Sequence, residues 1–340
     1  MKPNFDWKNL SFDYIKTNSN IRYQFSKGVW GEMRKYTSDH IDMHMAATCL
    51  HYGQECFEGL KAFKGKDGKV RIFRLNENAK RMNDSAREIF MPEIPKEIFK
   101  EAVINAVKLN QEFVPPYESG ASLYIRPLLI GTGPRVGLNP ADEYMFIVFV
   151  NPVGPYFKNG FKPISLLIDR DRDRAAPLGV GHVKVGGNYA ASFQSMEKAH
   201  KNGYDSVLFL DPKEKKYIDE CGPANFFAIK EKTYITPESK SILPSITNKS
   251  LMTLAEDMGL KVERRKIELR ELEEFDEVGA CGTAAVIGPV GRIVDEKFGK
   301  TYQYCHDGNP GTISTELYNR FRAIQYGDES DKFDWVTVIE

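Results

Sequence analysis

The apolar residues of this chain change their spacing along its length, and this change constrains the fold more than any other feature. Over residues 76–90 they recur every three or four positions, which is the spacing of an amphipathic helix. The runs 123–130 and 144–150 are instead rich in β-branched and aromatic residues, as strands are. The two patterns in succession predict a mixed α/β (α+β) protein.

The second half of the chain continues this alternation. The stretch 152–163 holds three prolines and two glycines, and we interpret it as a connection between two domains. Strands are predicted at 164–168, around Lys184, and at 206–210, 226–229, 262–269 and 278–294. Helices are predicted after Lys184, with Tyr189, Phe193, Met196 and His200 on one stripe, and at 247–258 and 313–326.

Composition points to a soluble enzyme with a small-molecule substrate. The 340 residues are 41% hydrophobic, which is enough for a large core. Basic and acidic residues both number 47, so the net charge gives no sign of a nucleic-acid or membrane partner. The N-terminus lacks the apolar run of a signal peptide, and we expect a cytoplasmic protein.

No metal or disulfide is predicted. The five cysteines are odd in number and scattered, without a Cys-x-x-Cys pair, so reduced buried thiols are expected. His40 and His44 have the spacing that places two imidazoles on one helix face, with Asp42 and His51 nearby. A third ligand has no clear place, and we therefore expect no metal site there.

The segment 182–189 places one lysine, Lys184, among apolar residues and follows it with Gly186 and Gly187. Burial lowers a lysine pKa, so the neutral amine needed for Schiff-base chemistry becomes accessible near neutral pH. Glycines let a ligand approach the backbone closely. A surface lysine next to a strand that ends in glycines would give the same pattern.

Eight sequence segments, the one at Lys184 included, together resemble the branched-chain amino-acid aminotransferases of fold-type IV, which use pyridoxal 5'-phosphate. The segments are 50–53 running into 57–59, 76–82, 123–127, 153–157, 184–189, 220–225, 243–247 and 281–285. Their number, order and spacing make the combination specific. The resemblance implies a smaller N-terminal α/β domain (1–155), a connection (156–163) and a larger C-terminal pseudo-barrel domain (164–340), with the cofactor between the domains.

The resemblance also assigns cofactor contacts. It implies a Schiff base on Lys184, whose freed amine then moves the substrate proton, and it places Glu220 against the pyridine nitrogen. Asp219 is the adjacent alternative, and the register with Gly222 and Asn225 favours Glu220. The remaining cofactor contacts implied are Arg81, Ile246, Thr247 and Thr283 at the phosphate and Tyr189 at the phenolic oxygen. A predicted helix start at 245–247 independently suits a phosphate, although simple N-capping explains it too.

The substrate site implied by the resemblance is apolar with one arginine. Its residues are Tyr52, Phe57, Tyr124, Arg126 and Tyr156, with Thr283 and Ala284 near the substrate carboxylate; core packing is the alternative for each aromatic. Arg126 could accept the γ-carboxylate of glutamate and turn aside for leucine. Val136 and Leu138 resemble a loop that reaches the neighbouring subunit's site, which implies a homodimer.

Two departures from the family pattern have consequences. Ser245 and Asn248 stand where the family often has a glycine and an arginine, so a charge near the phosphate is lost and cofactor affinity is affected. Ala285 and Gly288 stand where some relatives carry a redox Cys-x-x-Cys, and we expect no thiol switch at this place.

The sequence therefore predicts transamination between L-leucine, L-isoleucine or L-valine and 2-oxoglutarate, the 2-oxo acid of glutamate. A D-amino-acid aminotransferase or an aminodeoxychorismate lyase shares the lysine and the acid on the same fold, and substrate stereochemistry would separate them. A pyridoxal-phosphate or metabolite-binding protein without turnover is the alternative from another class. A nucleotide-phosphate loop at 131–134 is rejected because no Gly-Lys-Ser/Thr follows.

Overall fold

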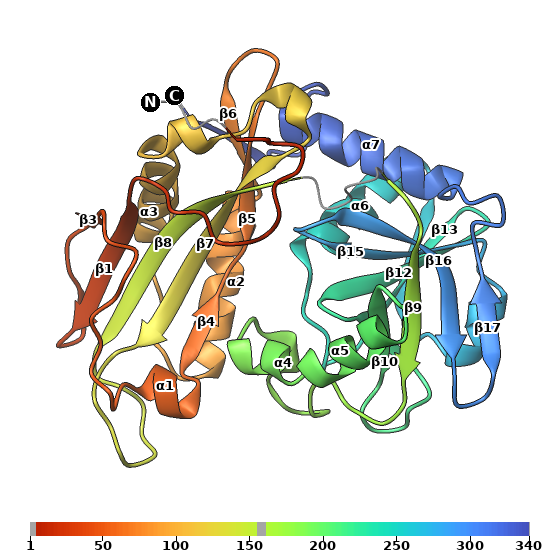
Figure 1. The fold of residues 1–340 in the computed structure, drawn as a ribbon, viewed down its shortest axis with the longest axis horizontal. Coiled ribbons are helices and arrows are strands. Elements are labelled where there is room, and N and C mark those ends of the chain that lie inside the picture. Colours follow the sequence, from red (N-terminus) through yellow and green to blue (C-terminus); the bar gives the residue numbers. More distant parts are fainter. Residues whose placement is uncertain (1–4, 155–160, 340) are drawn as a thin grey trace. The chain divides into compact units, whose positions relative to one another are not determined.

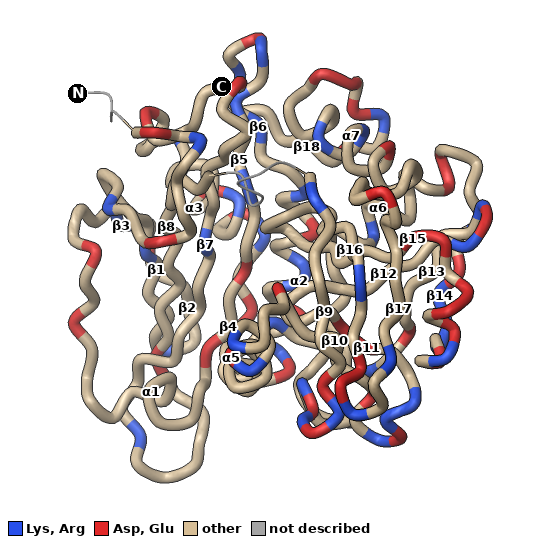
Figure 2. Tube along the Cα trace, turned by 45° about the vertical axis from the view of Figure 1, so that its right-hand side comes forward, with Lys and Arg blue, Asp and Glu red and all other residues tan. Residues whose placement is uncertain are grey.

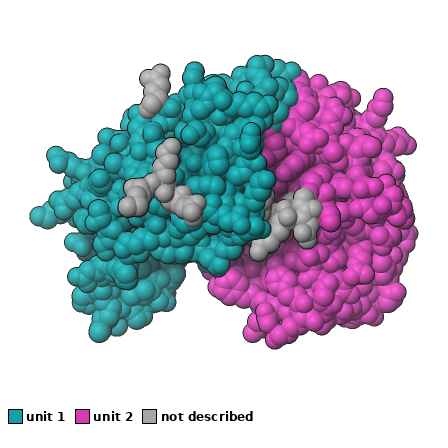
Figure 3. All heavy atoms as spheres, turned by 45° about the horizontal axis from the view of Figure 1, so that its top comes forward, with its two compact units in different colours: residues 1–158, 183–186, 323–340 teal, residues 159–182, 187–322 magenta. Residues whose placement is uncertain are grey.

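The computed structural model describes residues 5–154 and 161–339 (Figure 1). Contacts between Cα atoms divide the chain into two compact units, coloured in Figure 3. The first unit comprises residues 1–158, 183–186 and 323–340, and the second comprises 159–182 and 187–322. The predicted domain bounds therefore need a correction: 183–186 and 323–340 pack with the N-terminal part of the chain, which makes the first unit no smaller than the second. Tyr156 and most of the predicted connection 156–163 lie outside the described residues.

The first unit is built on a sheet of nine strands within the described part of the chain. The strands are β1 Asn20–Ser26, β2 Val29–Trp30, β3 Arg34–Tyr36, β4 Glu55–Phe57, β5 Leu60–Lys64, β6 Val70–Phe73, β7 Ser122–Gly131, β8 Tyr144–Val153 and β18 Val336–Ile339. Their order is β18-β6-β5-β7-β8-β1-β2, with β3 paired to β1 and β4 to β7. All these pairings are antiparallel, and β7 and β8 pair along their whole length.

Two helices cover one face of this sheet and lie behind it in Figure 1. Helix α2 (Leu75–Glu88) contacts β4, and helix α3 (Lys96–Lys108) contacts β8, β1 and β7. The apolar stripe predicted for α2 is buried at Ala79, Met82 and Ala86, and α3 stacks Phe99 on Phe146 of β8. These contacts confirm the helix predicted at 76–90 and show why it forms: one apolar face is removed from water. Short helices α1 (Thr48–Tyr52), η1 (Gln111–Phe113) and η2 (Tyr117–Ser119) complete this part.

The second unit contains a sheet that closes on itself. The strands are β9 Ile164–Asp169, β10 Ser206–Leu210, β11 Ile218–Cys221, β12 Ala224–Lys230, β13 Thr233–Pro237, β14 Lys261–Arg265, β15 Glu277–Gly282, β16 Val286–Asp295 and β17 Lys300–Gln303. Strands β11, β10, β9, β16, β15 and β12 pair in that order, and β11 also pairs with β12, which completes a ring. Strands β13 and β14 extend from β12, and β17 pairs with β16. The predicted barrel-like sheet is thereby confirmed.

Successive residues along the strands of this ring point to opposite sides of the sheet. On β9 and β10, Leu166 and Leu208 belong to one core cluster, whereas Leu167 and Val207 belong to another that packs on helix α5 (Phe193–Lys201). Such alternation is the expected consequence of the two-residue period of a strand. Helix α6 (Ile246–Asp257) packs against β14 and β15. The remaining helical segments are η3 Val180–His182, α4 Gly186–Ala190, η4 Leu269–Glu273 and α7 Thr312–Tyr326.

Three local predictions were wrong. Lys184 is not in a strand: η3 precedes it, and Val185 makes only an isolated bridge with Cys56. The single helix expected after Lys184 is two helices, α4 and α5, and Phe193 is 67% exposed. The strand predicted at 262–269 ends at Arg265. The strand residues predicted over 278–294 are confirmed, and they form two strands, β15 and β16, joined by a turn.

Charged residues of both signs are interspersed over the described chain (Figure 2). None of the helices in the described residues is long and apolar enough to cross a bilayer. His40 and His44 lie in a segment that is not helical, and His40 Nδ1 lies 2.9 Å from Asp39 Oδ1, so the helix-face premise of the metal hypothesis was wrong.

Candidate functional site

In the first unit, the predicted residues around Lys184 share one face of β4 and β7. Phe57 pairs with Leu128, and Glu55 with Ile130, so these residues point to the same side as Arg126 and Tyr124. The partial exposure of Tyr124, Arg126 and Leu128, against the burial of Leu123, Ile125 and Leu129, marks that side as the open one. Four of the residues expected in the active site thus lie together: Lys184, Phe57, Tyr124 and Arg126.

Hydrogen bonds of its backbone groups fix the position of Lys184, which is not part of a strand. Its N–H donates to Ser85 Oγ at 2.9 Å, and its carbonyl accepts from the N–H of Phe57 at 3.1 Å. Lys184 Nζ lies 4.7 Å from the centroid of the Phe57 ring. Burial, and then the positive charge of Arg81, lower the pKa of Lys184 to about 8. A substantial fraction of its amine is therefore neutral under mildly basic conditions, as a nucleophilic lysine requires.

Arg81 forms a two-point ion pair with Glu58. The Nε–Oε1 distance is 2.7 Å and the Nη2–Oε2 distance is 2.9 Å, and Glu58 is fully buried. Asn78 Nδ2 donates to the same carboxylate at 2.7 Å. Burial, the largest single influence, raises the pKa of Glu58, but the charge and hydrogen bonds of Arg81, together with Lys184 and Asn78, outweigh it, and the pKa lies below its usual range.

Arg126 presents a partly satisfied guanidinium on this open face. It lies over the rings of Phe57 (4.6 Å to the centroid) and Tyr124 (5.2 Å), and one Nη donates to Tyr124 Oη at 3.1 Å. Its buried Nε has no hydrogen-bond partner among the described residues. A buried donor without a partner is costly, so Arg126 is suited to receive an acceptor from a ligand.

Gly59 is required next to this group. A Cβ at position 59 would overlap the Tyr124 hydroxyl, so the position of the Tyr124 ring depends on a residue without a side chain at 59. This explains in physical terms why a glycine follows Phe57 and Glu58 in the sequence.

In the second unit, Glu220 is a buried, well-held carboxylate and not an exposed acid. Only 3% of it is exposed. Asn225 Nδ2 donates to Oε1 at 2.7 Å, and the N–H of Leu243 donates to the same atom at 2.9 Å. Arg174 Nε lies 2.7 Å from Oε2, an ion pair without the angle of a hydrogen bond. These donors favour the ionised carboxylate.

Asp219 is equally buried, but its contacts are different. Its Oδ2 accepts from Ser241 Oγ at 2.6 Å, and Oδ1 has no partner among the described residues. Burial raises the pKa of Asp219. The two neighbouring acids are therefore distinguishable by their surroundings: Glu220 is contacted by an arginine, an amide and a backbone N–H, whereas Asp219 accepts from a serine hydroxyl.

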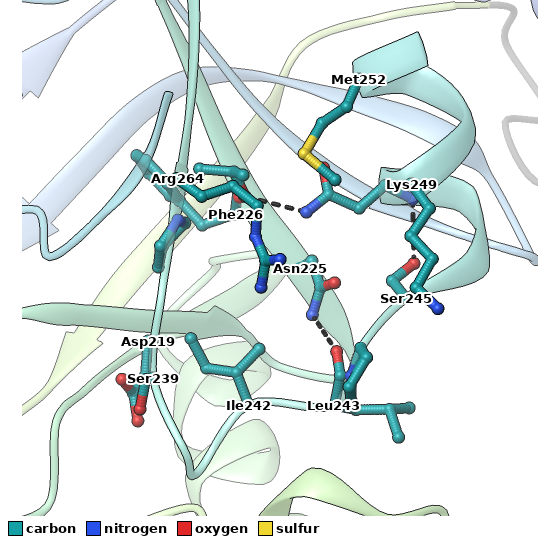
Figure 4. Close-up of a pocket in the computed structure, with 14 residues that line it drawn as sticks. Asp219, Asn225, Phe226, Ser239, Ile242, Leu243, Ser245, Lys249, Met252 and Arg264 are labelled. Carbon is teal, nitrogen blue, oxygen red and sulfur yellow. Dashed lines mark hydrogen bonds between the residues drawn. The ribbon is translucent and has the colours of Figure 1, made fainter. Parts of the chain in front are cut away.

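Helix α6 begins at the residues predicted to bind a phosphate. Ser245 Oγ accepts from the N–H of Asn248 at 3.1 Å and caps the helix, while Ile246 and Thr247 form its first turn (Figure 4). Capping by Ser245 leaves other N–H groups of this turn directed outward, as an anion site requires. The backbone argument made from the sequence therefore applies to a real helix start.

Ser245 and Asn248, which stand where the family often has a glycine and an arginine, line one cavity of about 230 Å³. Ser245 is labelled at this cavity in Figure 4. Asn248 is buried; its Nδ2 donates to Thr236 Oγ1 at 2.8 Å, and its side-chain Oδ1 accepts from Tyr234 Oη at 2.7 Å. Arg264 of β14 lines the same cavity, and so do Asn225 and Leu243, which hold Glu220. Asparagine at 248 thus has a structural role in the second unit, which a longer arginine could not fill in the same way.

The other predicted residues lie in turns and short helices. Thr283 and Ala284 form the turn between β15 and β16, next to Val286, which adopts a positive φ of 66°. Such a conformation is rare for a β-branched residue and marks this turn as constrained. Tyr189 lies in α4. Val136 and Leu138 are 88% and 83% exposed, and the hydroxyl of Tyr52 donates to the carbonyl of Val136.

Two residues of this face were missed as functional candidates, namely Glu55 and Glu58. Glu58 stood inside a motif that carried the resemblance, yet nothing in the sequence indicated that it would be buried against Arg81. Glu55 accepts a hydrogen bond from the N–H of Gly186, 131 residues away in sequence. Glu55 is the first residue of β4, and Glu58 directly follows that strand.

The fold and these side chains together define a class IV aminotransferase. A family model described as "Amino-transferase class IV" matches residues 55–293, and the chain belongs to this family. The branched-chain-amino-acid aminotransferase of Helicobacter pylori is 46% identical over 339 residues, covering 99% of this chain and 98% of that protein. The corresponding Haemophilus influenzae protein is 44% identical over 342 residues, covering 98% and 99%.

Solved structures lead to the same class. The Escherichia coli branched-chain amino acid aminotransferase superimposes with a TM-score of 0.77 at 27% identity, covering 94% of this chain and 99% of that one. The branched-chain amino acid aminotransferase from Thermobaculum terrenum, in its PLP form, gives a TM-score of 0.77 at 26% identity, covering 95% and 99%. Class IV aminotransferases depend on pyridoxal phosphate, so the chain is a pyridoxal-phosphate enzyme.

Proposed function

We propose that the protein is a branched-chain amino-acid aminotransferase that exchanges the amino group between L-leucine, L-isoleucine or L-valine and 2-oxoglutarate. The observation that carries this proposal is the desolvated amine of Lys184, which lies over Phe57 on the same strand face as Arg126. Relatives of that activity, 44–46% identical over nearly the whole chain, support the substrate class.

The described residues fit pyridoxal phosphate. When bound, the cofactor supplies an electron sink for the substrate Cα. Lys184 would hold it covalently, and the amine of Lys184, once released, would carry the proton removed from Cα. Ser85 and Phe57 fix the backbone of Lys184 by hydrogen bonds, so the amine has a defined position for both tasks.

Glu220 is proposed to keep the pyridine nitrogen protonated. A carboxylate does this only if it stays ionised, and Arg174, Asn225 and the N–H of Leu243 all favour that form. Tyr189 is proposed for the phenolic oxygen of the ring. For the phosphate we propose Ile246 and Thr247 at the start of α6, with Thr283 and Arg81. Arg81 would share its charge between the phosphate and Glu58.

The substrate residues proposed are Phe57, Tyr124, Arg126, Tyr52, Tyr156, Thr283 and Ala284. Phe57 and Tyr124 give an apolar, aromatic surface for an aliphatic side chain, and the unpartnered Nε of Arg126 gives a donor for the second carboxylate of glutamate. One face can therefore serve both kinds of substrate. This dual use is the physical requirement that an aminotransferase of this specificity has to meet.

We further propose a homodimer, and we propose that it is cytoplasmic. The homodimer is supported by Val136 and Leu138, large apolar side chains that are 88% and 83% exposed, which is unfavourable unless another surface covers them. Sedimentation of the wild type and of a Val136→Ser, Leu138→Ser variant tests this proposal. The wild type should sediment as a dimer, and the variant should dissociate at a concentration at which the wild type does not.

The experiment that tests the function is the absorption spectrum of the protein with bound pyridoxal phosphate, before and after L-leucine. We expect the cofactor band to shift with L-leucine and to return with 2-oxoglutarate, and no lysine-dependent band to form in Lys184→Ala. A shift with D-alanine but not L-leucine would replace the substrate assignment by that of a D-amino-acid enzyme. A band that L-leucine, D-alanine and 2-oxoglutarate leave unchanged would indicate a binding protein without turnover.

A further inference from the structure

The side chain of Glu55 is fixed by a contact that brings a second acid to the face of Lys184. Its Oε1 accepts a hydrogen bond of 2.5 Å from the N–H of Gly186, two residues after Lys184. A Cβ at position 186 would overlap the same carboxylate, so the contact depends on a glycine there. Val185, the residue before Gly186, forms an isolated β-bridge with Cys56, the residue after Glu55. Glu55 is thus held at one atom and cannot turn away into solvent without losing this bond.

The register of β4 and β7 brings Glu55 to the side of Arg126. Residues 55 and 57 of β4 and residues 124, 126 and 128 of β7 point to one side, and Arg126 reaches across to the ring of Phe57. Burial raises the pKa of Glu55, while the Gly186 N–H and the charge of Arg126 act against that rise. The acid and the guanidinium therefore interact electrostatically on one side of the sheet.

We propose that Glu55 is a specificity-determining residue, which sets the balance between dicarboxylic and aliphatic substrates by offsetting the charge of Arg126. This rests on the proposed function of the face. With Glu55 ionised, an incoming γ-carboxylate meets Arg126 and a nearby negative charge, while an aliphatic side chain meets a face whose charges compensate one another. Glu55 acts through Arg126 and is therefore a positioning residue, not a catalytic one.

The substitution Glu55→Gln separates charge from structure. Glutamine keeps the length of the side chain and an oxygen that accepts from the Gly186 N–H, but it carries no charge. Glu55→Ala removes both. Glu97→Gln, at an exposed acid on α3, is the matched control for loss of one negative charge in the same unit. All variants are compared with the wild type at pH 8 with pyridoxal phosphate bound.

The first readout is binding, which does not depend on turnover: calorimetric titration with glutarate, a dicarboxylate, and with 4-methylvaleric acid, an aliphatic monocarboxylate. We expect Glu55→Gln to raise the ratio of glutarate affinity to 4-methylvaleric acid affinity by roughly five- to tenfold. Glu97→Gln should leave the ratio within about twofold of the wild type, since its charge is exposed and screened. A Glu55→Gln ratio equal to that of the wild type overturns the proposal.

The second readout is steady-state kinetics, which separates this inference from the proposed function. Glu55→Gln should lower KM for L-glutamate and leave kcat with L-leucine within about twofold, whereas a structural defect would lower kcat with both substrates. A wild type that transaminates neither substrate refutes the proposed function. The role proposed for Glu55 would still hold if Glu55→Gln changed the ratio of glutarate affinity to 4-methylvaleric acid affinity. If neither acid binds to the wild type, both are overturned. If Glu55→Ala changes the ratio but Glu55→Gln does not, the hydrogen bond rather than the charge matters, and the inference fails.

Discussion

Glu58 and Arg81, 23 residues apart in the sequence, are joined by two short contacts of 2.7 and 2.9 Å in a place where Glu58 has no exposure to solvent. A buried carboxylate is tolerated only when its charge is compensated, and Arg81 with Asn78 supplies that compensation. The same arginine lowers the pKa of Lys184, whereas Glu58 raises it. The pair therefore links the packing of α2 to the protonation of the lysine.

Breaking the ion pair between Glu58 and Arg81 should destabilise the folded protein. We expect Glu58→Leu to lower the free energy of unfolding by roughly 3–5 kcal/mol, because it leaves the Arg81 charge uncompensated. The double variant Glu58→Leu, Arg81→Met should recover most of that loss, since both charges are removed together. Urea unfolding of the wild type, both single variants and the double variant gives the coupling. Asp84→Asn, at an exposed acid on the same helix, is the control and should cost less than about 1 kcal/mol. Equal losses in the single and double variants would contradict the prediction.

The pKa of Lys184 makes stability depend on pH in a defined direction. The unfolded chain carries an ordinary lysine pKa of 10.5, and the folded protein has about 8, so between these values the unfolded state binds more protons. The contribution of Lys184 to the free energy of unfolding of the cofactor-free protein should therefore increase by at most about 3 kcal/mol as pH rises from about 8 to 10.5. Below pH 8 both states are protonated and the contribution is constant.

The measurement is the difference in unfolding free energy between the wild type and Lys184→Met across that pH range. Every other titrating group cancels in the difference. Lys96→Met, at an exposed position, should give a flat difference. A flat difference for Lys184→Met as well would mean that the amine is as hydrated as in the unfolded chain.

The two adjacent acids of β11 should differ in their effect on turnover. Glu220→Gln removes the charge that Arg174 and two N–H donors favour, and we expect kcat with L-leucine to fall by at least about a hundredfold. Asp219→Asn, one residue earlier and equally buried, should change kcat less than about tenfold, because its neighbour is a serine hydroxyl. Steady-state kinetics and the absorption spectrum of the bound cofactor check both variants. A larger effect at Asp219 would reverse the assignment.

All five cysteines should react slowly in the folded protein. Each is free, and burial raises the pKa of Cys49, Cys56, Cys221, Cys281 and Cys305, so little thiolate is present near neutral pH. We expect a thiol-specific chromogenic disulfide at pH 7.5 to modify them at least about tenfold more slowly than free cysteine, and all five rapidly after unfolding. Reversible loss of activity on mild oxidation that maps to Cys281 would contradict this and would restore the idea of a thiol switch.

Periodic patterns in the sequence were sufficient to predict the positions of the long helices and strands. Helix α2 and strands β7 to β10 lie within a few residues of their predicted places, since each buries one continuous face or a whole run. Short strands without a pattern of their own, such as β5, β6 and β18, were not predicted, because neighbouring strands determine them. Lys184 was placed in a strand wrongly for a related reason: a serine hydroxyl from α2 takes the place that a ladder partner would have.

The chemistry of the site divides in the same way. The lysine, the acid and the helix start could be proposed from the sequence, because each has a local motif. The surroundings that give them their properties could not, since Arg81 and Glu58, Glu55 and Gly186, and Arg174 and Glu220 meet only through the tertiary fold. The burial of Glu220 is the most informative example, as the sequence alone left it an ordinary acid next to Asp219.

Strand β18 has a consequence for how this chain is made. It pairs with β6 at one edge of the first sheet, so residues 336–339 complete a body whose other strands are synthesised more than 180 residues earlier. During translation the edge of β6 stays open until residues 336–339 have been synthesised, and an open edge is a template for wrong pairing. The first unit therefore reaches its final form only after β18 is available, and a chain cut before Val336 should aggregate more readily than one that contains β18.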